Sequence, residues 1–444
     1  MAPTLQQVPL VDAAGDELRA LLSPVTPETF VHEHWGRKPL FVKGFPEKYR
    51  GLFSREAFIN ALAQPGPAAP DFLRASFDKK DGASSAKAPA GVSSTAFNAT
   101  PDQAVPLFKA GATLCATQIE TRVAGLARFS AAIKRQLGYP GRVTFNAYLS
   151  PPGAGFNWHF DGRIASTLQI EGTKRWRFSN SAAVAWPRGN GVVRADGAGQ
   201  YVDPRAGVEA WEQLAPFDEK DTTEVLLEPG DLLILPAGAW HDARGGDGGS
   251  LALNLSFTPI SYGILVRELL DGLLSAQPGW RGPAPLLPLE GGLPGEVDAR
   301  GLEAMAAELT RAADALRTLA TDNLALVGLW SSFVQATGFG GPDVRVPGAA
   351  PVVESDRLRV RADGQVYARL AEGRATLCVF FGAGGRIDVT GADIGLVQRL
   401  LSARAFTAGE CLAWGQGQGP TAWAEVQTTL TELVRQGLLE RVAA

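Results

Sequence analysis

The chain has 444 residues, of which 45% are hydrophobic and 20% charged, a balance typical of a soluble globular protein. Its 42 lysines and arginines and 46 aspartates and glutamates give a net charge of −4, which argues against a strongly basic nucleic-acid surface. A length of this order predicts about two or three domains rather than a single core.

Residues 1–141 predict a mixed, mostly helical region. Thr26-Pro27-Glu28 is typical of a helix start, and we expect that helix to reach the aromatic-rich stretch from Phe30 to Trp35. The segment 79–94 is poor in apolar side chains and rich in Gly, Ala and Ser. We expect a loop there, which could serve as a lid.

Residues 142–260 change to short runs in which apolar and polar side chains alternate, the pattern of half-buried strands. The first run contains Val143, Phe145, Ala147 and Leu149. Further strands are expected at 174–178, 225–227, 232–235 and 251–257. Glu228-Pro-Gly-Asp231 predicts a hairpin-like corner between two of them, and the Gly- and Pro-rich punctuation favours a β-sandwich or barrel.

The region 261–340 predicts helices. Its apolar side chains repeat at intervals of three and four residues, at Leu302, Met305, Leu309, Ala312, Leu316 and Leu319. Such a seam packs inside its own helical bundle or forms a subunit interface, and a second apolar helix at 264–274 could share either role.

The region 350–444 returns to small mixed elements. Thr407 and Glu410 have the spacing of a capping box that opens a helix. A later helical stripe consists of Trp423, Val426, Leu430 and Leu433, and it ends at Gly437. Together with a strand at 438–442, these elements predict a winged-helix-like domain.

The three cysteines, Cys115, Cys378 and Cys411, are too far apart for a zinc ribbon and odd in number. They therefore favour a reducing compartment. No signal peptide is evident, and no stretch reaches the roughly 18–20 apolar residues that a membrane span requires. A cytoplasmic protein is the expectation.

A metal site is predicted from two of the four histidines. His159 and Asp161 lie two residues apart, so on a strand both point to one face, and His241 follows another strand-like run. Two imidazoles and one carboxylate leave three coordination positions open, the arrangement of non-haem Fe(II) oxygenases. The alternative is that the two histidines are unrelated. Asp242 and Asp247, beside the second histidine, are expected to be loop residues.

The residues around these ligands carry a family resemblance. The motifs occupy 30–42, 146–161, 168–176 and 228–241. They resemble the cupin-type JmjC oxygenases, and within these the ribosomal oxygenases, which hydroxylate protein side chains. The resemblance implies an α+β protein with a double-stranded β-helix (cupin/JmjC jelly-roll) core. In that scheme 1–141 contributes N-terminal helices, 142–260 forms the barrel, 261–340 dimerises and 350–444 is the winged-helix-like domain.

The resemblance also implies the co-substrate pocket. In the family, 2-oxoglutarate chelates the iron, and a basic residue binds its distal carboxylate; Lys174 occupies that position. By itself Lys174 could equally be a solvated strand lysine. Asn146 and Tyr148 are expected to line the pocket, and Ser150 could offer a hydroxyl to the carboxylate. Asn254 and Ser256 are weaker candidates, each as readily an ordinary polar group of the barrel interior.

The implied function is an Fe(II)- and 2-oxoglutarate-dependent dioxygenase that uses dioxygen to hydroxylate a side chain of a protein or peptide. By the resemblance the substrate is a ribosomal protein and the enzyme a homodimer, with neither membrane nor nucleic acid as partner. One sequence feature departs from the family, because Gly162-Arg163 replaces an acidic or aromatic run. Arg163 could contact an acidic peptide or simply face solvent.

Four alternatives remain open. Histone demethylation lies within the family, although the acidic chain and the lack of histone-reading cysteine clusters argue against it. The substrate could be a ribosomally made peptide that is being tailored. A ligand-sensing transcriptional regulator would need several cations on its recognition helix, yet 421–436 contains only Arg435, beside Glu425 and Glu432. A zinc or manganese cupin with isomerase or hydrolase chemistry would give Lys174 no purpose.

Overall fold

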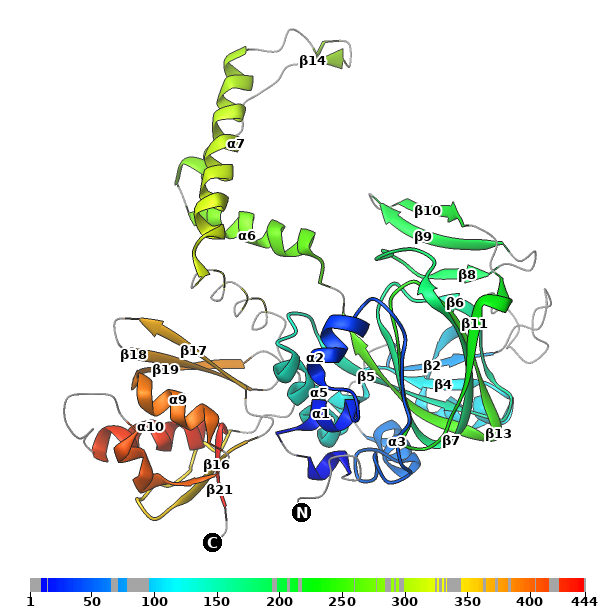
Figure 1. The fold of residues 1–444 in the computed structure, drawn as a ribbon, viewed down its shortest axis with the longest axis horizontal. Coiled ribbons are helices and arrows are strands. Elements are labelled where there is room, and N and C mark those ends of the chain that lie inside the picture. The colour runs from blue at the N-terminus through cyan, green and yellow to red at the C-terminus, as the bar shows by residue number, and fades with distance from the viewer. Residues whose placement is uncertain are drawn as a thin grey trace. The chain divides into compact units, whose positions relative to one another are not determined.

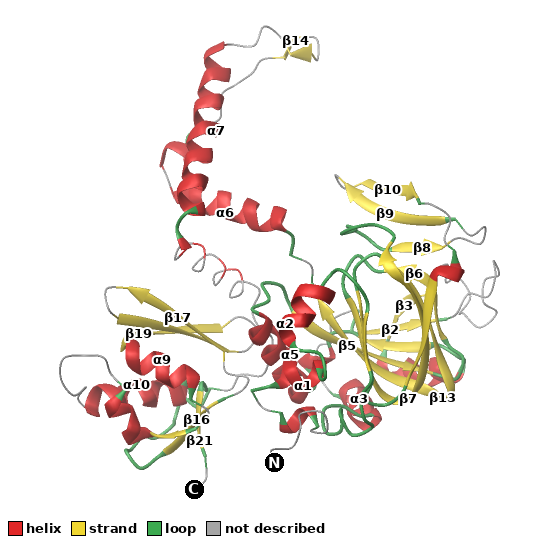
Figure 2. Cartoon of the chain, in the orientation of Figure 1, coloured by secondary structure: helices red, strands yellow, loops and turns green. Residues whose placement is uncertain are grey.

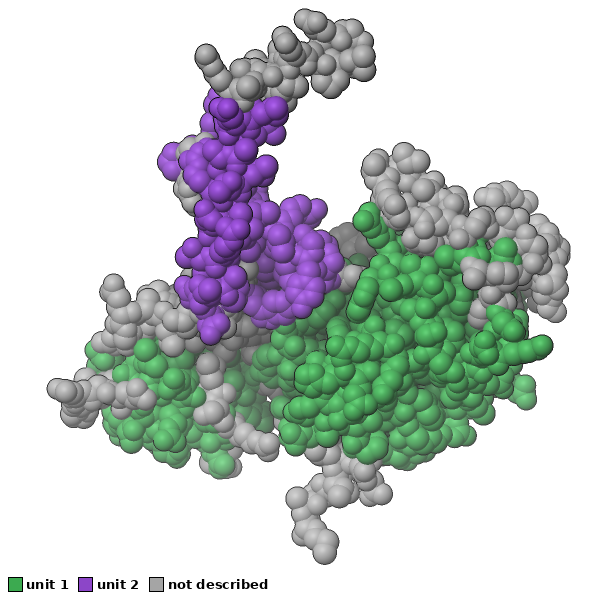
Figure 3. Space-filling view, turned by 45° about the horizontal axis from the view of Figure 1, so that its top comes forward, with its two compact units in different colours: residues 1–259, 338–444 green, residues 260–337 purple. Residues whose placement is uncertain are grey.

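The computed structural model divides the chain into two compact units, residues 1–259 with 338–444, and residues 260–337 (Figure 3). The structure describes residues 9–13, 15–64, 71–77, 96–193, 198–205, 208–214, 218–258, 260–276, 278–283, 289–290, 293–294, 299–323, 326, 330, 333, 345–361, 365–371, 374–381, 385–403, 405–414 and 423–442. The predicted loop at 79–94 lies outside these residues, so its role as a lid stays a prediction.

An antiparallel sheet of 13 strands dominates the described part of residues 1–259 (Figure 1). Its central path runs β10-β9-β8-β6-β13-β5-β4-β2-β3, while β7 pairs with β11, β12 and β13, and β1 pairs with β12. The strands are β1 Leu40–Val42, β2 Leu73–Ser76, β3 Ala96–Ala99, β4 Thr113–Ala116, β5 Val143–Ser150, β6 Gly155–Phe160, β7 Ala165–Ala182, β8 Gly191–Val193, β9 Gly199–Arg205, β10 Val208–Gln213, β11 Thr222–Leu227, β12 Leu232–Leu235 and β13 Ala239–Phe257.

Two strands are longer than the sequence predicted. β7 and β13 each run without a break, through positions expected to be turns or loops. Glycines make this possible, because Gly172 (φ +65°) and Gly249 (φ +77°) adopt left-handed backbone where the register between the two strands shifts. The predicted corner at 228–231 joins β11 to β12, but each of these pairs with β7 rather than with the other.

Helices cover one side of this sheet (Figure 2). They are α1 Glu17–Leu22, α2 Pro27–Thr29, α3 Arg55–Ala63, α4 Ala104–Lys109 and α5 Ala124–Leu137, with short helical turns at Leu10–Asp12, Pro101–Gln103 and Ile119–Thr121. A further short turn, Glu219–Asp221, precedes β11. Thr26 caps the predicted helix start, accepting from the Thr29 N–H at 3.1 Å, and the chain continues as a π-helix, Phe30–His34. Alternation explains the packing, because Phe145 and Ala147 face the helix side and are fully buried.

A buried carboxylate fastens the N-terminal segment to the barrel. Asp231 has no exposed surface and accepts hydrogen bonds from Lys43 Nζ (3.0 Å), the Gly44 N–H (2.9 Å) and the Glu228 N–H (2.9 Å). The pairing of β1 with β12 lies beside this contact. The interaction therefore fixes β12, the strand that leads into β13 and its histidine.

Replacing Asp231 by alanine is expected to lower the free energy of unfolding by about 2–4 kcal/mol. The change leaves buried hydrogen-bond donors, and the ammonium of Lys43, without the carboxylate that they bind. Urea denaturation measures the loss. Glu228→Ala is the matched control, since Glu228 contacts the same Lys43 but is 55% exposed, and it should cost about 1 kcal/mol or less. Equal losses in the two variants would contradict the role assigned to Asp231.

Residues 260–337 form helices α6 (Tyr262–Ala276) and α7 (Ala299–Ala320), a 3-10 turn Pro278–Arg281 and the short pair β14 (Leu289–Glu290) and β15 (Leu293–Pro294). The predicted apolar seam lies on α7. Leu302, Met305 and Leu309 are 49%, 42% and 67% exposed, whereas Ala312, Leu316 and Leu319 are half-buried. The first half of the seam is therefore not packed within its own bundle in the described part of the chain.

The C-terminal module builds its own core. Its elements are β16 (Arg357–Val360), β17 (Gln365–Ala371), β18 (Arg374–Phe381), β19 (Gly385–Asp393), α9 (Ile394–Ser402), β20 (Phe406–Thr407), the 3-10 helix Ala408–Ala413, α10 (Trp423–Arg435) and β21 (Leu439–Arg441). The predicted stripe on α10 is confirmed, because Val426, Leu430 and Leu433 are fully buried in that core. Two three-stranded sheets, β20-β16-β21 and β17-β18-β19, complete the module.

In the described residues, none of the helices combines the length and hydropathy required to cross a bilayer.

Candidate metal centre

Three predicted ligands meet at one end of the barrel. His159 lies on β6, Asp161 follows that strand directly, and His241 lies on β13. The antiparallel register places His241 opposite His159, and the two ring centroids are 4.3 Å apart. One donor atom from each of the three side chains lies within 4.8 Å of the others. The histidine was expected just beyond a strand, whereas it lies within one.

Backbone carbonyls hold both imidazoles in one tautomer. His159 Nδ1 lies 2.7 Å from the carbonyl of Asn157, and His241 Nδ1 lies 2.9 Å from that of Ala239. A carbonyl oxygen can only accept, so each Nδ1 carries the proton. Each Nε2 then keeps its lone pair for a metal, the second-shell arrangement of histidine ligands in metalloproteins.

The electrostatics of the site also suit a cation. Burial, and after it the charge of the neighbouring His159, lower the pKa of His241 to about 4. His241 is therefore a neutral donor at physiological pH. Asp161 supplies a carboxylate beside the two imidazoles. Neutral nitrogen donors and one anionic oxygen donor are what a divalent transition metal requires, so the residues fit such an ion.

A buried lysine lies in an aromatic pocket of the same barrel. Lys174 is 3% exposed, and its Nζ lies 5.7 Å from the Tyr148 ring centroid, 5.8 Å from that of Phe156 and 5.9 Å from that of Trp176. Among the described residues, the ammonium has no carboxylate partner. Burial lowers its pKa to about 8, so it is still charged at neutral pH. An uncompensated buried cation marks a place for an anion.

The aromatic residues join the two parts of the site. The Trp176 ring stacks on His241 with centroids 5.6 Å apart, and the Phe156 ring lies 6.1 Å from that of His159. The Tyr148 hydroxyl and the Cys115 thiol form a hydrogen bond. The Cys115 thiolate, burial and Asp161 raise the pKa of Tyr148 well above its ordinary value, so its hydroxyl keeps its proton. The sequence pattern pointed to Tyr148 but not to Cys115.

Three of the other four pocket candidates already have protein partners. Asn146 Oδ1 accepts from the Gln118 N–H at 3.1 Å, and Ser150 Oγ accepts from Thr113 Oγ1 at 3.1 Å. Asn254 Nδ2 donates to the Ser166 carbonyl at 2.7 Å, and Ser256 is buried. Nothing tests whether any of the four contacts a ligand, so their roles stay predictions.

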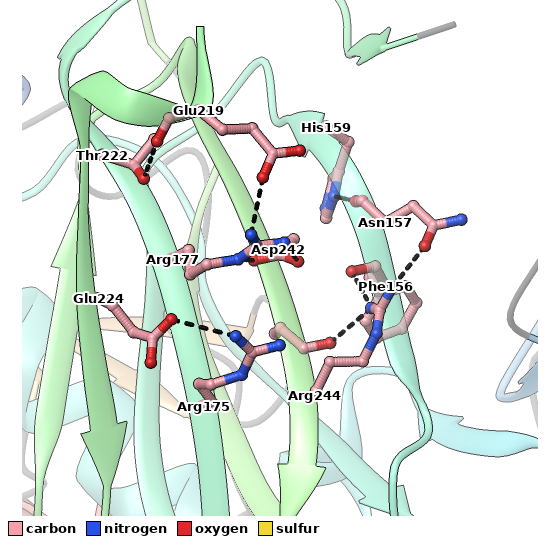
Figure 4. A network of polar contacts seen from close by, with 11 residues as sticks. Phe156, Asn157, His159, Arg175, Arg177, Glu219, Thr222, Glu224, Asp242 and Arg244 are labelled. Atoms are coloured by element: carbon pink, nitrogen blue, oxygen red, sulfur yellow. Dashed lines mark hydrogen bonds and ion pairs between the residues drawn. The ribbon is translucent and has the colours of Figure 1, made fainter. Parts of the chain in front are cut away.

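A salt-bridge network braces the strand that carries His241 (Figure 4). Arg177 binds Asp242 through two bonds, Nε–Oδ1 at 3.0 Å and Nη2–Oδ2 at 2.6 Å, and binds Glu219 at 2.8 Å. The expectation that Asp242 and Asp247 are loop residues was wrong, because both lie on β13. Asp242 is buried and paired across strands, whereas Asp247 is exposed. The sequence could not show that pairing, which depends on the register of β7 against β13.

Residues 119–264 match the JmjC domain family. This segment is a JmjC domain. The JmjC domain contains the whole metal centre and Lys174, and the matched residues run from just before α5 into α6. The predicted JmjC core is thereby confirmed, with its antiparallel sheet and helices.

Relatives agree with this assignment. The chain is 26% identical to YxbC of Bacillus subtilis (strain 168), an uncharacterized protein, over 58% of this chain and 76% of the relative. It is 28% identical to ribosomal oxygenase 1 of Gallus gallus, over 59% of this chain but only 40% of that protein. The predicted resemblance to ribosomal oxygenases is confirmed, although the chain spans less than half the length of the ribosomal oxygenase itself.

A solved structure shares the fold. YcfD, a ribosomal oxygenase from Escherichia coli solved in complex with cobalt and 2-oxoglutarate, matches with a TM-score of 0.51 over 95% of this chain and 99% of its own. The sequence identity is 16%, so this likeness describes the fold alone.

Alanine at His159, Asp161 or His241 is expected to lower the affinity for Co(II) at least about 100-fold, more than the loss typical of second-shell changes. Calorimetric titration of the metal-free protein measures it. His32→Ala is the control, because His32 is exposed and distant in sequence from the three ligands. Full affinity after loss of any one of the three would remove that residue from the centre.

Proposed function

We propose that the protein is an Fe(II)- and 2-oxoglutarate-dependent dioxygenase that hydroxylates a side chain of a protein or peptide. The observation that carries the proposal is the pairing of a three-residue metal centre with a buried lysine that has no carboxylate partner among the described residues, in one aromatic-walled barrel. The JmjC domain and the likeness to ribosomal oxygenases support it. A zinc or manganese isomerase would leave the charge of Lys174 unexplained.

His159, Asp161 and His241 would hold the iron on one face, leaving its other positions for co-substrate and dioxygen. When bound, iron and 2-oxoglutarate together supply the oxidising chemistry, with succinate and carbon dioxide as by-products. The protein's own contribution is geometric and electrostatic. The two Nδ1–carbonyl bonds fix the ring orientations, and the Arg177–Asp242 pair holds β13 in register beside them.

Lys174 would bind the distal carboxylate of 2-oxoglutarate. Its ammonium is buried and still protonated at neutral pH, so an entering carboxylate gains a charge-assisted hydrogen bond in a water-poor site. The Tyr148 ring lies 5.7 Å from that ammonium, and its hydroxyl, which keeps its proton, would be a second donor. The rings of Phe156 and Trp176 exclude water from the space between lysine and metal. Asn146, Ser150, Asn254 and Ser256 complete the proposed pocket lining.

Lys174→Met is expected to lower the affinity for 2-oxoglutarate at least about 100-fold, because it removes the charge that pairs with the carboxylate. Titration of 2-oxoglutarate into Mn(II)-loaded protein measures this, and anaerobic loading with Fe(II) followed by air measures succinate formation. Metal affinity should be unchanged, since Lys174 is not a ligand.

The pH dependence sharpens this test. Wild-type affinity for 2-oxoglutarate should be level below pH 8 and fall above it, towards about tenfold per pH unit, as free Lys174 loses its proton. Lys174→Arg keeps its charge, so whatever affinity it retains should not fall in that range. A wild-type affinity that rises or stays level up to pH 10 would contradict the lysine–carboxylate contact. No succinate from iron-loaded protein with any peptide pool would contradict the enzyme itself.

We further propose that the protein acts as a homodimer in the cytoplasm, through the exposed half of the α7 seam, and that the C-terminal module is winged-helix-like. A ribosomal protein is the substrate that the relatives suggest, and a ribosomally made peptide is the alternative. The α10 helix is a poor DNA-recognition helix, because its one cation, Arg435, lies 3.9 Å from Glu432.

Leu309→Lys is expected to shift a dimer towards monomer by at least about tenfold in dissociation constant, since it places a charge in a buried apolar contact. Sedimentation velocity gives the association state. Glu303→Lys is the control, because residue 303 lies on the opposite face of α7 and is exposed. Wild-type protein that sediments as a monomer, or equal effects of both changes, would contradict the dimer.

A further inference from the structure

A row of side chains leads across the sheet to the co-substrate pocket. Arg74 on β2 pairs in register with Cys115 on β4, which pairs with Tyr148 on β5. Paired residues in adjacent strands point to the same side of a sheet. Arg74 is exposed, whereas Cys115 and Tyr148 are half-buried, so the row runs from solvent into the pocket. Two strand spacings place the Arg74 backbone about 10 Å from that of Tyr148.

The side of β2 and β4 that carries Arg74 and Cys115 is polar, because it does not contribute to the hydrophobic core. The opposite side of the same strands carries Leu73, Ala75, Leu114 and Ala116, all buried against the helices. Ser76 and Thr113, the next pair along the polar side, are buried and continue it to Ser150. The polar side of β2 and β4 is therefore continuous with the side of β5 that carries Tyr148 and Ser150.

A second arginine approaches the same place from another element. Arg163 is exposed and lies two residues after Asp161, at the metal end of the barrel. Burial raises the pKa of Cys115 to about 11, and the positive charges of Arg74, Arg163 and Lys174 oppose that rise. Both guanidinium groups thus lie close enough to influence one thiol beside Tyr148.

Neither arginine is neutralised by the described part of the chain. Arg74 and Arg163 form no ion pair there, in contrast to Arg177, which binds two carboxylates. Asp161 is the nearby acid whose charge acts on Tyr148, and it is committed to the metal centre. Among the described residues, two guanidinium charges near this thiol therefore lack an ion-pair partner, in a protein whose net charge is −4.

We propose that the polypeptide substrate carries acidic side chains next to the hydroxylated residue, and that Arg74 and Arg163 bind them. The proposal rests on the proposed peptide hydroxylase function and narrows its substrate class. A guanidinium binds a carboxylate through two parallel hydrogen bonds, which fixes orientation as well as affinity. A target flanked by lysine and arginine, as in basic nucleic-acid-binding segments, would be repelled.

Three fluorescein-labelled peptides test this, with one shared central sequence flanked by three Glu, three Gln or three Lys residues. Fluorescence anisotropy measures their binding to protein loaded with Mn(II) and N-oxalylglycine, a non-reacting analogue of 2-oxoglutarate. At low salt, the Glu peptide should bind about tenfold more tightly than the Gln peptide, and the Lys peptide most weakly. An RNA hexamer serves as a competitor.

Charge reversal identifies the residues. Arg74→Glu and Arg163→Glu should each weaken binding of the Glu peptide about tenfold and strengthen that of the Lys peptide. Arg128→Glu, an exposed position on α5, is the control for net charge and should change neither. Similar binding of all three peptides, effects equal to the control, or displacement by RNA as strong as by the Glu peptide would overturn the proposal. Conversion of 2-oxoglutarate to succinate by the same preparation reports on the enzyme function separately.

Discussion

The site depends on one register, the antiparallel pairing of β6 with β13 that sets His241 opposite His159. This pairing brings the imidazoles together, and the carbonyls two residues before each histidine then fix the tautomer. A slip of one residue would turn a histidine to the other face of the sheet. Two further contacts stabilise this register. Asp231 binds the N-terminal segment to β12, and Arg177 on β7 pairs with Asp242 on β13.

The barrel places a buried cation, Lys174, where no described carboxylate pairs with it. Its ammonium lies 5.9 Å from the centroid of the Trp176 ring, which in turn stacks on His241. One strand, β7, thus supplies both the aromatic ring of Trp176 and the ammonium of Lys174. Two exposed cations show the same feature as Lys174. Arg74 and Arg163 have no carboxylate partner among the described residues.

The sequence predicted the parts that are set by local pattern. The spacing of His159 and Asp161, the alternation in 143–149 and the stripe on α10 each follow from one strand or helix. It did not predict the continuity of β7 and β13, because glycines that usually end a strand here form bulges. Nor did it predict the pairing of Asp242 or the place of Cys115. Both depend on strands distant in sequence, whose register no local pattern contains.

The central claim is that both histidines carry a proton at Nδ1, and that His241 is neutral, before any metal arrives. Nitrogen-15 NMR of the metal-free protein at pH 7 tests it, since ring-nitrogen shifts distinguish the two tautomers and the imidazolium. With four histidines in the chain, His159→Gln and His241→Gln assign the signals. Both rings are expected to carry a proton at Nδ1, and the His241 ring none at Nε2. A charged His241 ring, or either ring without a proton at Nδ1, would contradict this claim.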